Sequence, residues 1–428
     1  MTSAGTNAYF FTLGAELRMI NLTWLREDPK RVIELIKKKE PQFDIELLYE
    51  LDEKLRVIRS EVESLRQKKN ELAEKGKNGV TQELRDQSIA VGKELKNKEH
   101  LLDEVQKEFD FLYLGCPNIP FEDVPEGNKA ENVAVKIVGE KPKFSFAIKN
   151  HVELGEALGW LDFEAGVRMA GSQFPMYKGM GAQLVYALTR FMLKNNMKHG
   201  FEIMLPPCVT NETSLLVASN FPKFRDNVYS ISDDHLYLSP TAEVVLTNLY
   251  REHIFGDDQL PKRMTAWTSC FRREAGGYGA TERGLIRIHQ FEKVEIYTIC
   301  EPEQAQREHE RMVACAEDIL QQLGLHYRVS LLAAQDCSFP SAKTYDIEVW
   351  LPAQNSYYEV SSSSNCTDFQ ARRGSIRYKK SGMKKPELVH TLNTSSLAVP
   401  RLMVALLETY QQADGTVALP DVLTQFML

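Results

Sequence analysis

The stretch CFRREAGGYGATERGLIRIHQFEKVEIY, residues 270–297, decides how this sequence folds. Two apolar-rich runs flank a loop that contains four glycines, a pattern typical of a β-hairpin. If Ile286 to Tyr297 is one strand, side-chain alternation gives it two different faces. One face is apolar, and the other carries Arg287, His289, Phe291, Lys293 and Glu295. Arg272 and Glu274, two residues apart on the preceding strand, also share a face and are expected to join this charged surface.

Two interpretations of the charged face follow. It could be a solvated sheet surface that carries only cross-strand ion pairs. Alternatively, Phe291 stacks under a flat base while Arg272 and Arg287 hold phosphate groups. A phenylalanine in the middle of the charged face favours the second interpretation, because ion pairs alone do not require an aromatic ring there.

The bulk properties are those of an ordinary globular chain. Its 428 residues are 43% hydrophobic and 26% charged, and this length predicts two or three domains. The net charge of −7 argues against a protein coated in basic surface, so any nucleic-acid contact should be local. Seven scattered cysteines without a CxxC spacing argue against a disulfide framework or a zinc site and favour a cytoplasmic location. No apolar run reaches the roughly 18 residues that a membrane helix needs.

Residues 45–114 predict two helices of a coiled coil. Apolar residues recur three and four positions apart from Leu48 to Leu72 and again from Leu84 to Leu112. The sequence KGKNG at 75–79 breaks this pattern, which indicates a turn between two antiparallel helices.

The domain organisation follows from this arm. We expect a disordered extension at 1–18, with Met19 as an alternative start and a signal peptide as the less favoured interpretation. An N-terminal domain with the arm should cover 19–117, a linker and the start of the core 118–150, and a second domain 151–428. The second domain mixes strands and helices without a βαβ repeat, which predicts an α+β fold with a mostly antiparallel sheet flanked by helices.

Two segments carry an excess of basic residues. The arm has twelve basic and seven acidic residues between Lys54 and Lys98, although the whole chain is acidic. Residues 371–385 contain seven basic residues and no acidic one. In both segments a solvated face and contact with a polyanion remain open alternatives.

Several motifs together resemble the seryl-tRNA synthetases, a family of class II aminoacyl-tRNA synthetases. FRRE followed by RGLIRIHQFEKVE resembles motif 2 of that class. HGFEIMLPPCV, residues 199–209, resembles motif 1 with Pro207 as its proline, and TLNTSSLAVPRLMVALLETYQ, residues 391–411, resembles motif 3. LYLSPTAEVVLTNLY, residues 236–250, is similar to the serine-binding Thr-x-Glu segment, and YYEVSSSSNCTDFQARR, residues 357–373, to the metal-proximal strand.

This resemblance implies an ATP-dependent ligase that converts L-serine to seryl-adenylate and transfers the seryl group to the 3′ end of tRNA(Ser), and also of tRNA(Sec). The serine carboxylate attacks the α-phosphorus of ATP, so the reaction needs alignment and cations more than a general base. An inactive paralogue, an enzyme that loads a carrier protein and a coiled-coil scaffold fit less well, because the ATP motifs and the long arm occur together. The chain has neither a GxxxxGK[ST] loop nor a strand-linked GxGxxG motif.

The resemblance also implies how ATP is bound. Arg272 would hold the α-phosphate and help to bind the serine carboxylate, while Arg287 and Arg401 would hold the γ-phosphate. Phe291 would stack on the adenine, with Glu274 near the adenine amino group. Arg401 has separate support, because it follows a proline at the start of an apolar helix, where a helix N-terminus favours anions.

The Mg²⁺ ligands implied in the same way are Glu359 and Ser362, whose oxygen atoms suit a hard cation. A regular strand would place residues three apart on opposite faces, so the sequence predicts a bend between them.

Recognition of serine is assigned by the resemblance to Thr241, Glu243, Arg272, Glu295, Asn393 and Ser395. Glu295 with Thr241 would bind the ammonium group, and Asn393 and Ser395 would bind the hydroxyl. For Glu243 a purely structural role remains open. Thr394 replaces a glycine that is common in the family and is expected to reshape the pocket.

The implied partners are tRNA, contacted by the arm, and a second copy of the chain, contacted through motif 1 around Pro207. The motif 2 loop departs from the family pattern between Gly277 and Glu282. We expect this departure to change contacts with the acceptor stem of tRNA and to leave those with ATP intact.

Overall fold

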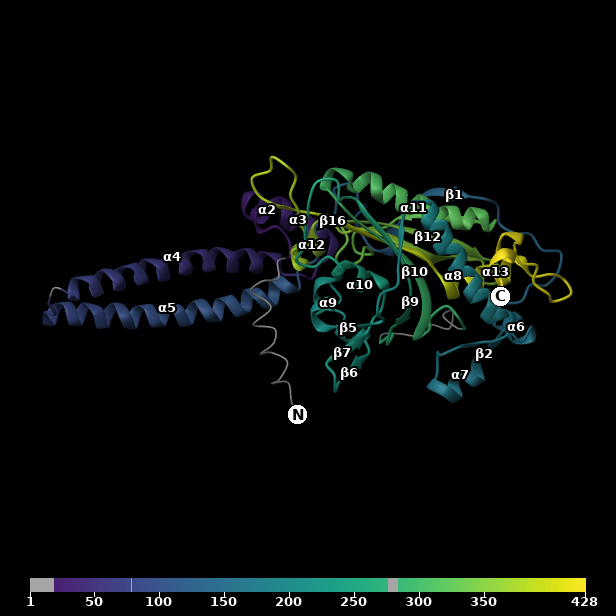
Figure 1. The fold of residues 1–428 in the computed structure, drawn as a ribbon, viewed down its shortest axis with the longest axis horizontal. Helices are drawn as coiled ribbons and strands as arrows, with labels where there is room; N and C mark the ends of the chain where they lie inside the picture. Colours follow the sequence, from purple (N-terminus) through teal and green to yellow (C-terminus); the bar gives the residue numbers. More distant parts are fainter. Residues whose placement is uncertain (1–18, 78, 276–283) are drawn as a thin grey trace. The chain divides into compact units, whose positions relative to one another are not determined.

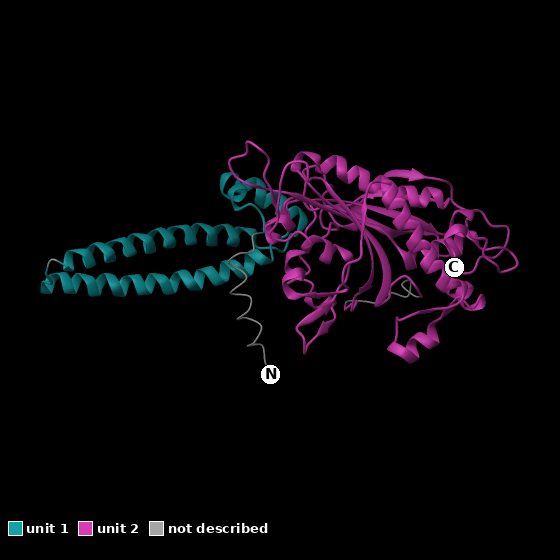
Figure 2. Cartoon of the chain, viewed as in Figure 1, with its two compact units in different colours: residues 1–117 teal, residues 118–428 magenta. Residues whose placement is uncertain are grey.

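The computed structural model describes residues 19–77, 79–275 and 284–428 (Figure 1). The expected extension at 1–18 and the motif 2 loop at 276–283 lie outside these residues. Contacts divide the chain into two compact units, Met1–Pro117 and Asn118–Leu428 (Figure 2). The segment 118–150, expected to hold a linker and the start of the core, contributes the edge strand β1 to the second unit.

The first unit is helical. Its helices are α2 (Leu22–Glu27), α3 (Pro29–Lys39), α4 (Ile45–Gly76) and α5 (Gln82–Leu114). The side chains of Asp44 and Thr81 accept backbone N–H bonds at the first turns of α4 and α5 and so cap these helices.

The two long helices confirm the predicted antiparallel hairpin. Leu55, Val62, Leu95 and other seam residues are buried, as the heptad spacing requires. Charged pairs flank this seam. Arg66 Nη2 lies 2.8 Å from a carboxylate oxygen of Glu99, and these residues are 33 positions apart in sequence.

The second unit is built on an eight-stranded sheet that confirms the predicted α+β fold. Its strands, in spatial order, are β1 (Val133–Val138), β11 (Tyr327–Leu331), β12 (Lys343–Leu351), β13 (Ser356–Asn365), β16 (His390–Ala398), β10 (Gln290–Cys300), β9 (Lys262–Phe271) and β4 (Glu202–Met204). Neighbouring strands pair antiparallel except β4 and β9, which pair parallel.

Helices cover both faces of this sheet. The main core packs α8 (Met180–Lys198), α11 (Ala305–Gln322) and α13 (Val399–Tyr410) against the face that carries Val294 (Figure 1). A second cluster packs α10 (Ala242–Asn248) and α12 (Phe369–Gly374) against the opposite face, which carries Tyr297. Because alternate residues of β10 point to opposite faces, Phe291, Lys293 and Glu295 lie on the Tyr297 face.

The remaining elements are short. They are α6 (His151–Ala157), β2 (Leu161–Asp162), α7 (Phe163–Ala170), β3 (Met176–Tyr177), β5 (Val209–Asn211), α9 (Glu212–Val217), β6 (Ser230–Ile231), β7 (Leu236–Leu238), β8 (Ile254–Phe255), β14 (Arg377–Tyr378) and β15 (Glu387–Leu388), with 3-10 turns at Lys129–Glu131, Arg225–Asn227, Pro302–Gln304, Pro352–Gln354 and Asp421–Phe426.

The predicted strand boundaries of the charged hairpin were wrong. Strand β9 ends at Phe271 and β10 begins at Gln290, so Arg272, Glu274 and Arg287 lie just beyond the paired strands. The backbone N–H of Arg273 bonds to the carbonyl of Asn227 instead of to the neighbouring strand, and Glu274 has a left-handed φ of 48°. The chain therefore turns away from the sheet where alternation alone predicted that it would continue.

Candidate active site

Three guanidinium groups converge on one cavity at the end of β10. The cavity has a volume of about 280 Å³, and Arg272, Arg287 and Arg401 line it together with Phe291 and Glu359. The first two arginines come from the chain beside the hairpin strands, and Arg401 from the first turn of α13. The structure therefore brings together residues that are 129 positions apart in sequence. Such a concentration of cations beside an aromatic ring suits a nucleoside triphosphate.

Each arginine is already oriented by a protein partner. Arg272 Nε donates to the carbonyl of Pro240 at 3.3 Å, and its guanidinium lies 5.2 Å from the Phe291 ring centre. Arg287 Nε donates to a carboxylate oxygen of Glu274 at 2.7 Å. The predicted adenine partner Glu274 thus forms an ion pair across the hairpin with a predicted phosphate-binding residue, as the first interpretation of the charged face allowed.

Arg401 links two walls of the cavity. Its Nη1 donates to the carbonyl of Glu359 at 3.0 Å and lies 3.4 Å from a carboxylate oxygen of the same residue. Its Nε donates to the carbonyl of Ile286 at 3.4 Å. Phe291 is half-buried and lines both this cavity and a second one.

The predicted ammonium-binding residues form a buried cluster beside this cavity. Thr241 Oγ1 donates to a carboxylate oxygen of Glu295 at 3.0 Å, and Glu295 is only 1% exposed. Lys293 Nζ donates to Thr241 Oγ1 at 2.7 Å and forms an ion pair with Glu295. Lys293 therefore neutralises the buried carboxylate, which would otherwise be costly to bury. Sequence reasoning placed Lys293 on this face without assigning it to the site, although its spacing of two from Glu295 was the available signal.

The predicted hydroxyl-binding residues lie on β16. Asn393 and Ser395 pair with Tyr297 and Glu295 of β10, so they share the face of the ammonium cluster. Asn393 Nδ2 donates to Glu243 Oε1 at 3.1 Å, and Gln370 Nε2 donates to the same oxygen at 2.7 Å. Burial, followed by the nearby charge of Glu295, raises the pKa of Glu243 to about 7.

Thr394 does not reshape this pocket directly, contrary to expectation. Its side chain lies on the other face of β16, where it is buried and its Oγ1 is 2.7 Å from Ser363 Oγ. The expectation failed because alternation directs neighbouring residues of a strand to opposite faces.

The predicted metal ligands are brought onto one face by a bulge. In the pairing of β12 with β13, Glu359 lies opposite Glu348 and Ser361 lies opposite Ile347, so Val360 is the extra residue. This bulge is the bend that the spacing of Glu359 and Ser362 requires. Glu359 lines the cavity, whereas Ser362 is not among its lining residues.

A third side chain with oxygen donors lies beside these two and was not predicted from the sequence. Asp346 pairs with Ser362 across β12 and β13, so the two side chains lie on the same face of the sheet. Its Oδ1 atom is buried and has no hydrogen-bond partner within the described residues. Burial, followed by the charge of Glu359, raises the pKa of Asp346 well above its usual range. No motif signals Asp346, because only the strand register brings it to the site.

The oxygen atoms of Glu359, Ser362 and Asp346 fit a hard divalent cation such as Mg²⁺. Across the part of the chain that the structure describes, no three His, Cys, Asp or Glu residues form a metal-binding group. An ion here would therefore complete its coordination with phosphate oxygens or water, as Mg²⁺ commonly does.

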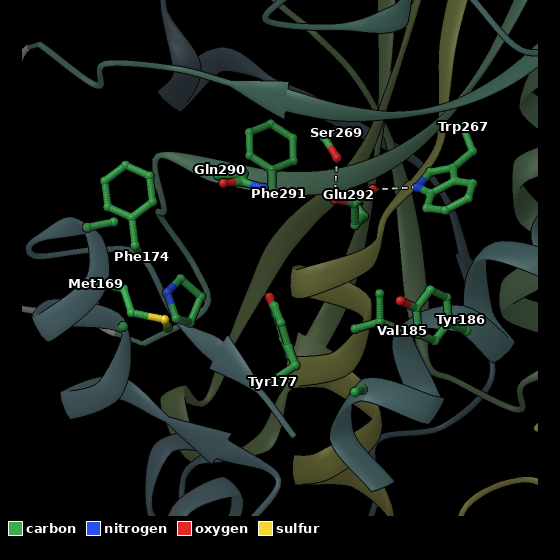
Figure 3. Close-up of a pocket in the computed structure, with 14 residues that line it drawn as sticks. Met169, Phe174, Tyr177, Val185, Tyr186, Trp267, Ser269, Gln290, Phe291 and Glu292 are labelled. Atoms are coloured by element: carbon green, nitrogen blue, oxygen red, sulfur yellow. Dashed lines mark hydrogen bonds between the residues drawn. The ribbon is translucent and has the colours of Figure 1, made fainter. Parts of the chain in front are cut away.

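A second cavity, of about 600 Å³, lies on the opposite face of β9 and β10 (Figure 3). Trp267 Nε1 and Ser269 Oγ donate to the two carboxylate oxygens of Glu292 at 2.5 and 2.7 Å. Figure 3 shows both donors pointing at Glu292, with Tyr177 and Tyr186 across the pocket. Phe291 is the one predicted site residue among those lining it.

Known proteins match the chain over nearly its whole length. The profile of the seryl-tRNA synthetase N-terminal domain matches residues 19–120, and that of the tRNA synthetase class II core domain (G, H, P, S and T) matches residues 227–410. A serine–tRNA ligase of Syntrophobacter fumaroxidans is 45% identical over 96% of this chain and 98% of its own length.

Solved structures agree. A seryl-tRNA synthetase from Pyrococcus horikoshii, complexed with ATP, is 32% identical with a TM-score of 0.89, over 95% of this chain and 98% of that one. A cytoplasmic serine–tRNA ligase from Naegleria fowleri, in complex with AMP, is 26% identical with a TM-score of 0.84, over 96% and 97% of the two chains. Together with the helical hairpin, the antiparallel sheet and the cationic cavity, these matches show that the chain belongs to the seryl-tRNA synthetase family of class II aminoacyl-tRNA synthetases.

Proposed function

We propose that the protein activates L-serine with ATP to form seryl-adenylate and pyrophosphate, and then transfers the seryl group to the 3′ end of tRNA(Ser). The observation that carries this proposal is the cavity lined by Arg272, Arg287 and Arg401 beside the buried Glu295 cluster. The arginine cavity suits a triphosphate, and the buried carboxylate of Glu295 suits the ammonium group of an amino acid. The two related structures, one complexed with ATP and one in complex with AMP, support a nucleotide as the ligand of this cavity.

Activation requires alignment and charge stabilisation. In this proposal Arg272 holds the α-phosphate and the serine carboxylate together, which brings the attacking oxygen to the phosphorus. Arg287 and Arg401 hold the γ-phosphate and stabilise the charge that develops on the leaving pyrophosphate. Phe291 stacks on the adenine, and Glu274 accepts from its amino group, which requires Glu274 to share its carboxylate with Arg287.

Glu359 and Ser362 are the proposed Mg²⁺ ligands, and the orphaned oxygen of Asp346 supports an ion at this place. When bound, Mg²⁺ would supply positive charge for the phosphate oxygens. The protein's own contribution is to hold these oxygen donors on one face through the bulge at Val360.

Serine is proposed to bind with its ammonium group at Glu295 and Thr241 and its hydroxyl at Asn393 and Ser395. Glu243 would act by fixing the amide of Asn393, since Asn393 Nδ2 donates to it. With that N–H group engaged, the carbonyl oxygen of the amide remains to accept the serine hydroxyl. A site of this kind rejects an amino acid without the hydroxyl, such as alanine, by as much as ~10⁴-fold.

We further propose that the α4–α5 arm contacts tRNA(Ser), and also tRNA(Sec), through its excess of basic residues. The basic segment 371–385 is a weaker candidate for this contact. Arg373 is 4% exposed and donates to the carbonyl of Leu216, and Arg372 forms an ion pair with Asp368. These contacts leave the segment less basic surface than its sequence indicated.

A homodimer through motif 1 is the proposed assembly. Around Pro207, Leu205 is 88% exposed, and Ile203 and Met197 are about half exposed. Large apolar side chains grouped in this way favour burial against another surface. The proposed location is the cytoplasm, where ATP and tRNA occur and thiols stay reduced. Among the described helices, none has the length and hydrophobicity needed to cross a bilayer.

The experiment that tests the proposed function is serine-dependent exchange of pyrophosphate into ATP without tRNA, with threonine, alanine and cysteine in parallel. Exchange with serine alone supports the activation site. Exchange with another amino acid would make the assignments of Asn393 and Ser395 wrong, and no exchange from folded protein would overturn the enzymatic proposal.

A further inference from the structure

A buried histidine outside the three motifs contacts the chain that leads into Arg287. His151 is the first residue of α6, and its side chain is 5% exposed. Its Nε2 atom accepts the backbone N–H of Leu285 at 3.3 Å. Leu285 is fully buried and lies two residues before Arg287.

The protonation of this ring is fixed by a second buried residue. His151 Nδ1 lies 3.1 Å from Glu408 Oε1, and the Glu408 side chain is 0% exposed. A backbone N–H can only donate, so Nε2 must be the unprotonated nitrogen and the ring proton of the neutral form is on Nδ1, facing the carboxylate. Glu408 also accepts the backbone N–H groups of His151 and Ala353 at 3.2 and 3.1 Å. The carboxylate thus holds both the ring and the start of α6.

Helix α13 therefore contacts the same short stretch twice. Arg401 donates to the carbonyl of Ile286, and Glu408, seven residues later on the same helix, reaches the N–H of Leu285 through His151. Residues seven apart lie on one side of a helix. Two neighbouring residues of the segment that leads to Arg287 are in this way held by one rigid element.

The ring also packs against the backbone itself. Gly284 has a φ of +70°, and a Cβ atom there would lie 2.3 Å from His151 Nε2. A side chain at position 284 would therefore displace the ring from Leu285. The glycine allows the close approach, and the histidine fills the space that it leaves.

We propose that His151 is a positioning residue for ATP binding, which sets the backbone at Leu285 so that Arg287 reaches the γ-phosphate. This inference rests on the proposed function, because the role of Arg287 does. His151 is not among the residues that line the arginine cavity, so it acts through the backbone. The serine-binding cluster lies on other elements and should be unaffected.

Two substitutions at His151 distinguish its hydrogen bond to Glu408 from its hydrogen bond to Leu285. In His151→Asn the amide can replace Nδ1 as donor to Glu408 but does not reach Leu285. In His151→Gln the longer side chain can offer an oxygen to the Leu285 N–H. ATP binding measured by calorimetry should weaken roughly tenfold in the asparagine variant and by no more than about threefold in the glutamine variant. The KM for serine in pyrophosphate exchange should stay within about twofold of wild type in both.

Two further variants separate positioning from packing. The Gln411 side chain forms hydrogen bonds with the backbone of Lys149, just before α6, and does not contact Leu285. Gln411→Ala should therefore leave ATP affinity unchanged. Glu408 is buried away from the cavity. In Glu408→Gln the new amide can donate to Nδ1 of His151, which would move the ring proton to Nε2, so that Nε2 could no longer accept from Leu285. Glu408→Gln should weaken ATP binding as much as His151→Asn and provides the test if that variant does not fold.

Equal ATP affinities in wild type and His151→Asn would overturn the proposal. So would equal weakening by the asparagine and glutamine variants, or by Gln411→Ala. Wild-type protein that binds ATP but exchanges no pyrophosphate with serine would instead contradict the proposed function, since calorimetry measures the effect of His151 independently of catalysis.

Discussion

Lys293 donates to Thr241 at 2.7 Å and also forms an ion pair with Glu295, so one cation connects the two residues proposed to bind the serine ammonium group. Both charges are nearly fully buried. Without substrate the lysine satisfies the carboxylate. When serine binds, its ammonium group would lie beside Glu295 together with Lys293. The oxygens of Glu295 and Thr241 would then accept hydrogen bonds from its N–H groups. The pair therefore connects folding stability to substrate recognition.

Replacing Glu295 should separate these two roles. Glu295→Gln leaves Lys293 buried without its counter-charge, so it should destabilise the fold by ~3 kcal/mol and lower serine-dependent exchange at least ~10³-fold. The double variant Lys293→Met with Glu295→Gln should recover stability to within about 1 kcal/mol of wild type and stay inactive. Urea unfolding and pyrophosphate exchange test both statements. Near-normal exchange by the stable double variant would remove Glu295 from the serine site.

Adjacent arginines offer a matched test of the phosphate cavity. Arg272 lines the cavity, whereas Arg273 is exposed and not among its lining residues. We expect Arg272→Gln to lower kcat/KM for ATP by ~10²–10³-fold, because a charge that stabilises the transition state is lost. Arg273→Gln, which makes the same chemical change one residue away, should stay within about twofold of wild type. If both variants lose activity equally, the assignment of Arg272 is wrong.

The raised pKa of Glu243 predicts a specific pH dependence of stability. Its pKa is about 7 in the folded protein, against 4.5 for an ordinary exposed glutamate. Between these two pH values the folded protein binds more protons than the unfolded chain, so stability falls as pH rises. In Glu243→Gln this contribution is absent. As pH rises from 4.5 to 7, the free energy of unfolding of wild type should therefore fall by up to roughly 3 kcal/mol more than that of the variant.

Urea unfolding of both proteins across this pH range measures the difference, in which the other titrating groups largely cancel. Parallel curves for wild type and Glu243→Gln would mean that Glu243 titrates at its ordinary pKa in the folded protein.

The orphaned oxygen of Asp346 predicts a role at the proposed Mg²⁺ site. Asp346→Asn should raise the Mg²⁺ concentration required for half-maximal ATP binding by about tenfold, as expected when a group beside a metal loses its charge. Asp318→Asn is the control, because Asp318 bonds to His199 and is not among the residues that line the cavity. Calorimetric titration of ATP at several Mg²⁺ concentrations distinguishes the variants, and superimposable Mg²⁺ curves for wild type and Asp346→Asn would contradict the prediction.

Some of this site could be predicted from the sequence because periodicity is local. The heptads of α4 and α5 identified the hairpin, and period-two alternation placed Phe291, Lys293 and Glu295 on one face of a strand. The same rule failed at Glu274, where the chain leaves the sheet with a left-handed φ, since no local pattern signals that turn.

Other features depend on contacts between distant segments. The spacing of Glu359 and Ser362 required a bend, but only the pairing of β12 with β13 located the bulge at Val360 and brought in Asp346. The contact of His151 with Leu285 joins residues 134 positions apart, and although Leu285 lies in motif 2, no spacing in the sequence points to His151. Such tertiary contacts leave no local signal in a single sequence.

The register of the arm permits a deletion that tests its role. Arg59 Nη2 bonds to Gln106, and Arg66 bonds to Glu99, so residues 63 and 102 face each other across the hairpin.

Replacing residues 63–102 with a short glycine-containing turn should preserve the seam near Leu55 and Phe109, and hence the fold of the shortened arm. Serine-dependent pyrophosphate exchange should stay within about twofold of wild type, because the residues proposed to act in activation all lie in the second unit. Charging of tRNA(Ser) should lose at least about tenfold in kcat/KM, and the wild-type advantage should shrink with added salt, since phosphate contacts release counterions. Equal charging by the shortened and full-length proteins across salt concentrations would assign the basic residues of the arm to solvation alone.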